Sequence, residues 1–237
     1  MCPATEISER LSQVQERIAA AARTAGRNPD GVRLIAVSKG QPLSAVVQAF
    51  DAGQRDFGEN YLEEAEPKIQ STPSAIAWHM IGHVQSRKAK IVVTKFAWVH
   101  SVDSLALAGR LSRFAVEGGF IVNIFLECNV SGEATKFGWP AADSSAWPGL
   151  IAGWRTVLGL PGLVVAGLMT MAPYSTDPER SRPVFHKLRE LRDLACRDLA
   201  CQNEWGLSMG MSDDFEQAVE EGATCLRVGR AIFGFRQ

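Results

Sequence analysis

The chain has 237 residues and a mass of 25.8 kDa, a length that suits one α/β barrel of about 250 residues. Hydrophobic residues make up 46% and charged residues 22%, which excludes a disordered chain, a collagen-like repeat and a disulfide-rich miniprotein. The 25 Lys and Arg residues against 26 Asp and Glu residues give a net charge of −1, so nothing indicates a nucleic acid or another polyanionic partner.

An amphipathic helix opens the chain, because apolar residues recur at helical spacing from Ile7 to Ile18 before Gly26. The predicted strands are 33–39, 55–59, 77–82, 97–102, 121–129, 163–170, 203–209 and 224–229. The helices predicted between them are one from Pro42 to Gly53 and others at 61–70, 85–94, 104–117, about 149–158, 178–201 and 213–221. The segment 138–150, rich in Pro, Ser and Gly, is predicted to be a surface loop.

Eight strands that alternate with helices predict a parallel sheet, and the number eight favours closure into a TIM-type (β/α)8 barrel. An open doubly wound sheet is the alternative, because one sequence does not reveal strand order. The chain contains no Pro/Ser-rich linker between two halves. We therefore expect one domain, residues 1–237, with an extra helix at its N-terminus.

Lys39 directly follows an apolar predicted strand, at the edge of the barrel where active sites of this fold lie. Partial desolvation there would lower the pKa of the amine and favour a nucleophile for a carbonyl group. The alternative is a surface lysine whose stem lies along the strand end.

The last two predicted strands run into loops suited to a phosphate group, Leu207–Asp214 and Arg227–Gly234. Gly210 and Gly229 allow the backbone to approach an anion, a helix start supplies N–H donors, and Ser208 could add a hydroxyl. The alternative is a pair of ordinary turns, with Ser212 as the N-cap of helix 213–221.

A nucleophilic lysine opposite a phosphate site suits a phosphorylated aldehyde, either pyridoxal phosphate or the sugar phosphate of an aldolase. Arg227 favours pyridoxal phosphate, because a guanidinium facing a pyridine nitrogen disfavours protonation of that nitrogen. A salt bridge between Arg227 and a carboxylate at the rim is the other interpretation.

The chain resembles a known family in segments that span residues 34 to 234. They are Leu34–Lys39 (LIAVSK), Phe57–Tyr61 (FGENY), Trp78–Lys88 (WHMIGHVQSRK), His100–Ser104 (HSVDS), Asn129–Glu133 (NVSGE), Gly167–Met169 (GLM) and the two loops above. On these residues the chain is similar to the pyridoxal phosphate homeostasis proteins, which are related to the barrel domain of alanine racemase.

The resemblance implies a single barrel that holds pyridoxal 5′-phosphate as a Schiff base on Lys39. It also implies which residues surround the cofactor. Asn60 and His83 would line the ring, Arg227 would lie toward the pyridine nitrogen, and the phosphate would lie near Ser208, Met209, Gly210, Gly229 and Arg230.

The function implied by the resemblance is a carrier for intracellular pyridoxal phosphate homeostasis, without established turnover and with pyridoxal-phosphate-dependent apo-enzymes as partners. The alternative is an amino-acid racemase of the alanine racemase type. Against it, we expect no second domain with an opposing acid–base residue, because the chain ends at Gln237 soon after the last strand. We expect a monomer.

Three positions differ from the family pattern. Gly40 stands where Thr is usual, Arg230 stands where a small hydroxyl residue is usual, and Phe137 after Lys136 is atypical. At position 230 a side-chain hydroxyl contact to phosphate is therefore not available, and the arginine either adds charge to that site or points to solvent.

Other polar residues are predicted to be structural. We expect no metal site, because His79 and His83 would share one face of a strand without a nearby carboxylate or cysteine to complete a ligand set. Glu59 and Asp103 are predicted to form rim salt bridges, and the basic segment 85–90 to be a solvated helix face. Met169 and Met171 are predicted to fill the barrel core.

The chain has five cysteines, at positions 2, 128, 196, 201 and 225, none in C-x-x-C spacing. The first ten residues carry Glu6 and Glu9 and no apolar run, unlike a signal peptide. The longest apolar stretch, Leu160–Met171, is interrupted by Pro and Gly, so we expect no membrane span. We expect a reduced, cytoplasmic, soluble protein.

Overall fold

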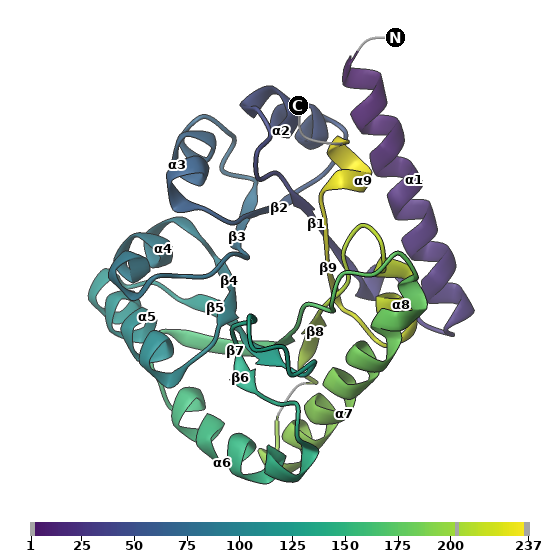
Figure 1. The fold of residues 1–237 in the computed structure, drawn as a ribbon. Helices are drawn as coiled ribbons and strands as arrows, with labels where there is room; N and C mark the ends of the chain where they lie inside the picture. The colour runs from purple at the N-terminus through teal and green to yellow at the C-terminus, as the bar shows by residue number, and fades with distance from the viewer. Residues whose placement is uncertain (1–2, 202–203, 235–237) are drawn as a thin grey trace.

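The computed structural model describes residues 3–201 and 204–234, and its parallel strands close into a barrel (Figure 1). The strand order is β4-β3-β2-β1-β9-β8-β7-β5-β6, and β4 also pairs with β5. That pairing closes a ring of eight strands, β6 remaining outside it, so the TIM-type barrel is confirmed and the open doubly wound sheet is wrong. The strands are β1 (Arg33–Val37), β2 (Asp56–Glu59), β3 (Ala77–Met80), β4 (Trp98–Val102), β5 (Val122–Asn129), β6 (Trp139–Pro140), β7 (Leu163–Met169), β8 (Gly206–Ser208) and β9 (Cys225–Val228).

Helices surround the ring, and the N-terminal helix α1 lies outside it alongside α8 and α9 (Figure 1). The predicted extra helix at the N-terminus is therefore confirmed. The helices are α1 (Pro3–Thr24), α2 (Leu43–Asp51), α3 (Leu62–Gln70), α4 (Ala89–Lys95), α5 (Leu105–Gly118), α6 (Trp147–Leu158), α7 (Arg182–Asp198), α8 (Phe215–Glu220) and α9 (Arg230–Phe233).

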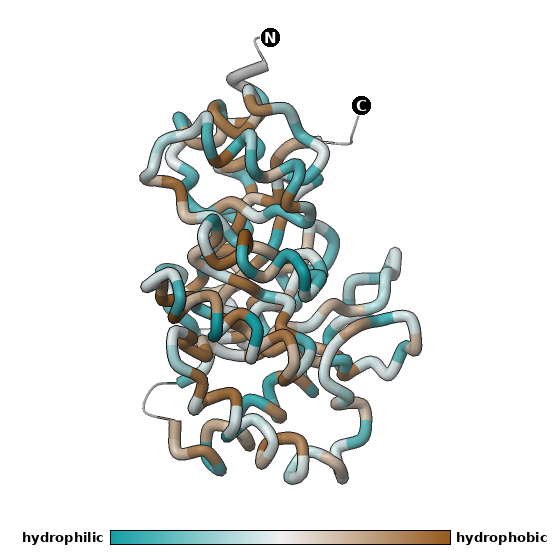
Figure 2. Tube along the Cα trace, turned by 90° about the vertical axis from the view of Figure 1, so that its left-hand side faces the viewer, coloured by the Kyte–Doolittle hydropathy of each residue, from teal (hydrophilic) through white to brown (hydrophobic). Residues whose placement is uncertain are grey.

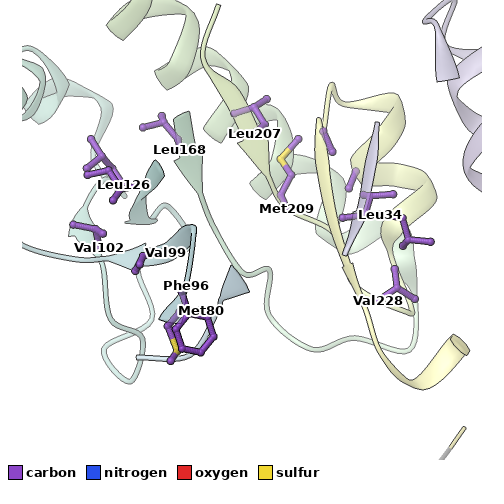
Figure 3. Close-up of a cluster of buried hydrophobic side chains, with 14 of the residues drawn as sticks. Leu34, Met80, Phe96, Val99, Val102, Leu126, Leu168, Leu207, Met209 and Val228 are labelled. Atoms are coloured by element: carbon purple, nitrogen blue, oxygen red, sulfur yellow. The ribbon is translucent and has the colours of Figure 1, made fainter. Parts of the chain in front are cut away.

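The hydrophobic core has an outer layer between strands and helices and a smaller cluster inside the ring. Figure 3 shows part of the outer layer, and the side chains labelled there include Leu34, Val99, Leu126, Leu168, Leu207 and Val228 from the strands. The inner cluster consists of Ile35, Phe125, Met169 and Cys225. In the side view, hydrophobic and hydrophilic residues alternate along the chain (Figure 2), as expected for elements with one face on a core.

The predicted surface loop 138–150 is wrong in part. It contains strand β6, a 3-10 turn at Ser144–Ala146 and the start of α6. Two indole N–H groups hold this segment in place: that of Trp139 donates to Val102 O at 3.0 Å, and that of Trp147 donates to Ala141 O at 3.0 Å.

Several predicted boundaries shift. The predicted helices 85–94 and 178–201 begin as 3-10 turns, Ser86–Lys88 and Pro178–Ser181, before α4 and α7 start. The predicted strand 203–209 narrows to β8, and its residue 203 lies outside the described residues. In the described part of the chain, no helix combines the length and the apolar character that a bilayer crossing requires.

Candidate functional site

A cavity of about 600 Å³ opens where β1, β2, β3 and β9 end. Five of the predicted cofactor contacts lie on its wall: Lys39, Asn60, Arg227, Gly229 and Arg230. The structure therefore brings together residues that are as much as 191 positions apart, because closure of the barrel sets β9 beside β1. Four predicted contacts, Ser208, Met209, Gly210 and His83, lie outside this wall.

Lys39 reaches the cavity because of the alternation along β1. Val37, the last residue of the strand, and Lys39 both line the cavity, whereas Ser38 between them is directed to the opposite side and is fully buried. The side chain of Lys39 is half-buried at the cavity wall. The turn continues through Gly40, whose φ of +71° lies in the left-handed region that a Thr would occupy only with strain. The turn conformation thus accounts for the glycine at this position.

A buried ionic cluster lies behind Lys39. Glu59 Oε1 accepts hydrogen bonds from Ser38 Oγ at 2.7 Å and from Lys68 Nζ at 2.7 Å. Lys68 Nζ also donates to Ser38 O at 2.8 Å and to Glu64 at 2.7 Å. Burial raises the pKa of Glu59, and the hydrogen bonds from Lys68 and Ser38 oppose this shift. The predicted salt bridge of Glu59 exists, but it is buried beneath the cavity and not at the rim.

Arg227 is a buried cation at the cavity wall. Its Nη1 donates to Ser208 Oγ at 2.6 Å, and its Nη2 donates to Thr170 O at 2.8 Å. These partners, a hydroxyl and a carbonyl, replace the rim carboxylate of the salt-bridge interpretation, which is therefore wrong. Burial lowers the pKa of Arg227 to about 10, and the nearby carboxylates of Glu127 and Asp214 oppose this shift. The guanidinium therefore stays charged at neutral pH.

In the loop after β8, the residues that line the cavity come later in the sequence than the predicted ones. Ser208, Met209 and Gly210 are buried beneath the wall, which Met211, Ser212 and Asp213 form. Gly210 has φ +93°, and a Cβ there would lie 2.5 Å from the Cβ of Ala218, so this glycine permits close packing of the loop on α8.

Ser212 does not cap α8, so this part of the alternative interpretation, a pair of ordinary turns, is wrong. The helix begins at Phe215, and the side chain of Asp214 accepts a hydrogen bond from the Met211 N–H at 2.7 Å. Ser212 Oγ instead accepts from the Ala231 N–H at 3.2 Å, which ties the two predicted phosphate loops together. Asp213 pairs with Arg230 across the same two loops. Continuing the serine–methionine–glycine run to Ser212 would have identified this cavity hydroxyl from the sequence.

His83 lies away from the cavity wall, on the neighbouring rim. Its ring stacks on Phe137, with centroids 4.1 Å apart, and its Nδ1 lies 3.3 Å from Asp103 Oδ2. The strand predicted through residue 82 ends at Met80, so His83 and the barrel-facing His79 do not share one strand face. Asp103, for which a rim salt bridge was predicted, thus has this histidine as its neighbour.

Glu127 is a titratable group that sequence reasoning missed. It lies near the end of β5 and is 4% exposed. Burial, and after it the neighbouring Asp103, raise its pKa to about 7, while Arg227 opposes the shift. A carboxyl group with this pKa changes charge close to neutral pH.

Two further sequence predictions concern methionines and metals. Met169 fills the barrel interior as predicted, but Met171 is 37% exposed and lines the cavity, because the chain leaves the barrel after β7. Among the described residues there is no group of three or more His, Cys, Asp or Glu side chains that could hold a metal ion. Cys128, Cys196, Cys201 and Cys225 are free thiols.

Comparison with known proteins first identifies the class: residues 10–237 match the alanine racemase N-terminal domain family. An alanine racemase from Clostridium difficile shares the fold, with a TM-score of 0.72 at 12% identity over 98% of this chain and 57% of its own.

Closer relatives identify the family. A protein named pyridoxal phosphate homeostasis protein from Pseudomonas aeruginosa is 43% identical over 231 residues, 97% of this chain and 96% of its own. The PipY protein of Synechococcus elongatus, solved without and with pyridoxal phosphate, is 37% identical, covers 96% of this chain and all of its own, and has TM-scores of 0.84 and 0.80. The chain belongs to the pyridoxal phosphate homeostasis protein family.

Proposed function

We propose that this chain binds pyridoxal 5′-phosphate and serves in intracellular pyridoxal phosphate homeostasis, with Lys39 as the covalent attachment point. The observation that carries the proposal is one cavity, at the carboxyl ends of the strands, whose wall holds both the Lys39 amine and the buried guanidinium of Arg227. The names of the curated relatives and the pyridoxal-phosphate-bound structure of the PipY protein support it.

The residues present fit this cofactor. A volume of about 600 Å³ lies in the usual range for small-molecule sites. Ser212 and the turn at Gly229 line the wall beside Arg230 and offer a hydroxyl, backbone and positive charge for a phosphate. Ser208 Oγ is already bonded to two buried partners, so we assign the hydroxyl contact to Ser212. His83 would contribute only through the rim.

The chemistry requires a nucleophilic amine and a fixed cation. Pyridoxal phosphate supplies an aldehyde, which condenses with a primary amine to a C=N bond and one water molecule, reversibly. Lys39 offers its amine from the half-buried end of β1. Arg227 stays charged and disfavours a proton on a nearby pyridine nitrogen, which weakens the ring as an electron sink. These properties suit storage of the cofactor better than turnover.

Further features of the proposal rest on the sequence alone. A single domain, a monomeric state, a cytoplasmic location and delivery to pyridoxal-phosphate-dependent apo-enzymes stay predictions. Delivery would be detected as transfer of the bound cofactor to an added apo-enzyme faster than its release into buffer.

The proposal is tested with the visible absorption of the purified chain mixed with pyridoxal phosphate. The wild type should develop an imine band, and Lys39→Ala should abolish the band while retaining weak binding through the phosphate contacts. Lys90→Ala, on an exposed position of α4, is the matched control and should behave as wild type. A colourless wild type, or a band that persists in Lys39→Ala, would contradict the proposal.

A second candidate function is an amino-acid racemase, because Tyr174 brings a 79% exposed phenol to the cavity wall, where an acid–base group could act. Exchange of the α-proton of amino acids in deuterated water tests it. Sustained exchange that Tyr174→Phe abolishes would establish turnover and contradict a pure carrier. Borohydride trapping with a sugar phosphate in place of pyridoxal phosphate would instead indicate an aldolase.

A further inference from the structure

A continuous chain of buried hydrogen bonds crosses the inside of the barrel and ends at the cavity. Asp56 Oδ1 lies 2.9 Å from His79 Nε2, and His79 Nδ1 lies 3.0 Å from His100 Nε2. His100 Nδ1 lies 2.8 Å from Ser208 Oγ, which accepts the 2.6 Å hydrogen bond from Arg227. Both histidines and Ser208 are fully buried, whereas Asp56 is 23% exposed.

The two ends of this chain determine where its protons lie. The guanidinium of Arg227 only donates, and a carboxylate such as Asp56 only accepts. Ser208 therefore accepts from Arg227 and can donate its own proton to His100. The proton of each neutral imidazole is then on Nε2, so that His100 donates to His79 and His79 donates to Asp56.

If the hydrogen bonds ran in the reverse direction, the one between His79 and Asp56 would be lost. If His79 carried its proton on Nδ1, its bare Nε2 would face the Asp56 carboxylate, and two acceptors would lie 2.9 Å apart. A second proton on either ring is disfavoured, because burial lowers the pKa of His79 and lowers that of His100 still further.

We propose that Asp56, His79, His100 and Ser208 form a one-directional hydrogen-bond relay that positions the guanidinium of Arg227 at the cavity wall. These four are positioning residues, because they act on the cavity through Arg227. The consequence for bound pyridoxal phosphate rests on the proposed function, whereas the relay itself is a property of the unloaded chain.

Aromatic neighbours hold the histidine rings of the relay in orientation. His79 stacks on Trp98, with centroids 5.5 Å apart and planes at 14°, and His100 stacks on Phe125 at 4.6 Å and 23°. Arg33 lies at the Asp56 end of the relay. Its Nη1 is 3.5 Å from Asp56 Oδ1, and its Cζ lies 4.7 Å from the centre of the Trp98 ring.

The charged and titratable groups around the relay come from several strands. They are Arg33 from β1, Asp56 from β2, Glu127 from β5, and Cys225 and Arg227 from β9.

Two fixed points orient Arg227. The Ser208 hydroxyl holds one of its terminal nitrogens and the Thr170 carbonyl holds the other. Thr170 is itself fixed, because its hydroxyl donates to Cys128 O at 2.8 Å. Loss of the Ser208 contact would leave the guanidinium plane free to turn about the remaining bond.

Nitrogen NMR of the histidine-labelled, unloaded full chain tests the relay directly. His79 and His100 should both give signals of neutral rings protonated on Nε2 at neutral pH. His83 and His186, whose side chains are 40% and 48% exposed, provide internal reference signals. Asp56→Asn replaces the accepting end with an amide that also donates, so it should alter the nitrogen signals of His100, which Asp56 does not touch.

Ser208→Ala tests the connection to Arg227 and to the cofactor. It should shift the guanidinium signals of Arg227, weaken pyridoxal phosphate binding about tenfold, and displace the pH titration of the bound chromophore. Ser112→Ala, which removes a buried hydroxyl that donates to Pro161 O, is the matched control and should change none of these.

Each outcome decides the proposal. Wild-type rings protonated on Nδ1, or a His100 signal unchanged by Asp56→Asn, would overturn the relay. An unchanged chromophore titration together with an unchanged Arg227 signal in Ser208→Ala would also overturn it. If the wild type forms no imine, the proposed function fails, and the His100 and Arg227 signals of the unloaded chain still decide the relay.

Discussion

Lys39 and Lys68 lie on the two sides of the same strand end, and only Lys39 lines the cavity. Lys68 is 5% exposed, and its three N–H donors are all used, on Ser38 O, Glu59 and Glu64. Lys39 lies at the wall of a cavity of about 600 Å³, which Asn60 and the loop that follows β8 also line.

If Lys39 is the attachment point that we propose, this difference separates a structural lysine from a reactive one within one fold. An ammonium whose three protons all bond to oxygen has no lone pair to offer a carbonyl, and it has no room for a ligand. A lysine on a cavity wall has room for an electrophile. The strand alternation that points Ser38 away and Lys39 inward therefore places the Lys39 amine, the one that we propose to react, at the cavity.

The largest effect should come from breaking the structural side of this comparison. Lys68→Met leaves Glu59 buried without its cation, at an expected cost of about 3–5 kcal/mol in the free energy of unfolding. Urea unfolding measures this cost. Lys88→Met removes a lysine from a partly exposed pair with Glu63 and should cost no more than about 1 kcal/mol. Equal costs for the two variants would show that the Lys68 cluster is not a buried ion pair.

An intermediate effect concerns Glu127, the buried carboxyl group that interacts electrostatically with Arg227. Its pKa in the folded chain is raised to about 7, so the unfolded chain releases this proton first as the pH rises. Its contribution to stability is complete below the ordinary carboxyl pKa and is lost as the pH rises from there to about 7, a loss of roughly 3 kcal/mol. Glu127→Gln should remove this decline. Parallel stability–pH curves for wild type and variant would contradict the shift.

The smallest effect should come from Arg230, the residue that departs from the family pattern. Arg230→Thr removes a charge at the cavity wall and its pair with Asp213. The affinity for pyridoxal phosphate should fall about threefold and should depend less on salt, because exposed charges are screened. Titration at low and high ionic strength measures this. An unchanged affinity at low salt would mean that Arg230 is directed away from the phosphate.

The sequence predicted the barrel and much of the cavity wall for a physical reason. Apolar strands of similar spacing, each followed by a helical pattern, determine the order of elements, and in such a barrel strand ends share one face. Lys39, Asn60, Arg227 and Gly229 each follow or end a strand, so all were placed on the correct face.

The sequence did not predict contacts that depend on where each loop turns. Ser212 was taken for a helix cap because hydroxyl residues often cap, but Asp214 holds that turn. His83 was assigned to the ring by the family resemblance, but β3 ends at Met80 and the histidine stacks on Phe137 at the neighbouring rim. The contact between His100 and Ser208 joins residues 108 positions apart across the barrel interior, and no periodic pattern encodes it.

The most direct test of Lys39 as the reactive amine is borohydride reduction of the full chain with pyridoxal phosphate, followed by peptide mapping. The reduced adduct should be found on the peptide that contains Lys39, in a ratio of one per chain. An adduct on Lys68, Lys136 or another lysine, or a chain that takes up no label, would contradict the account.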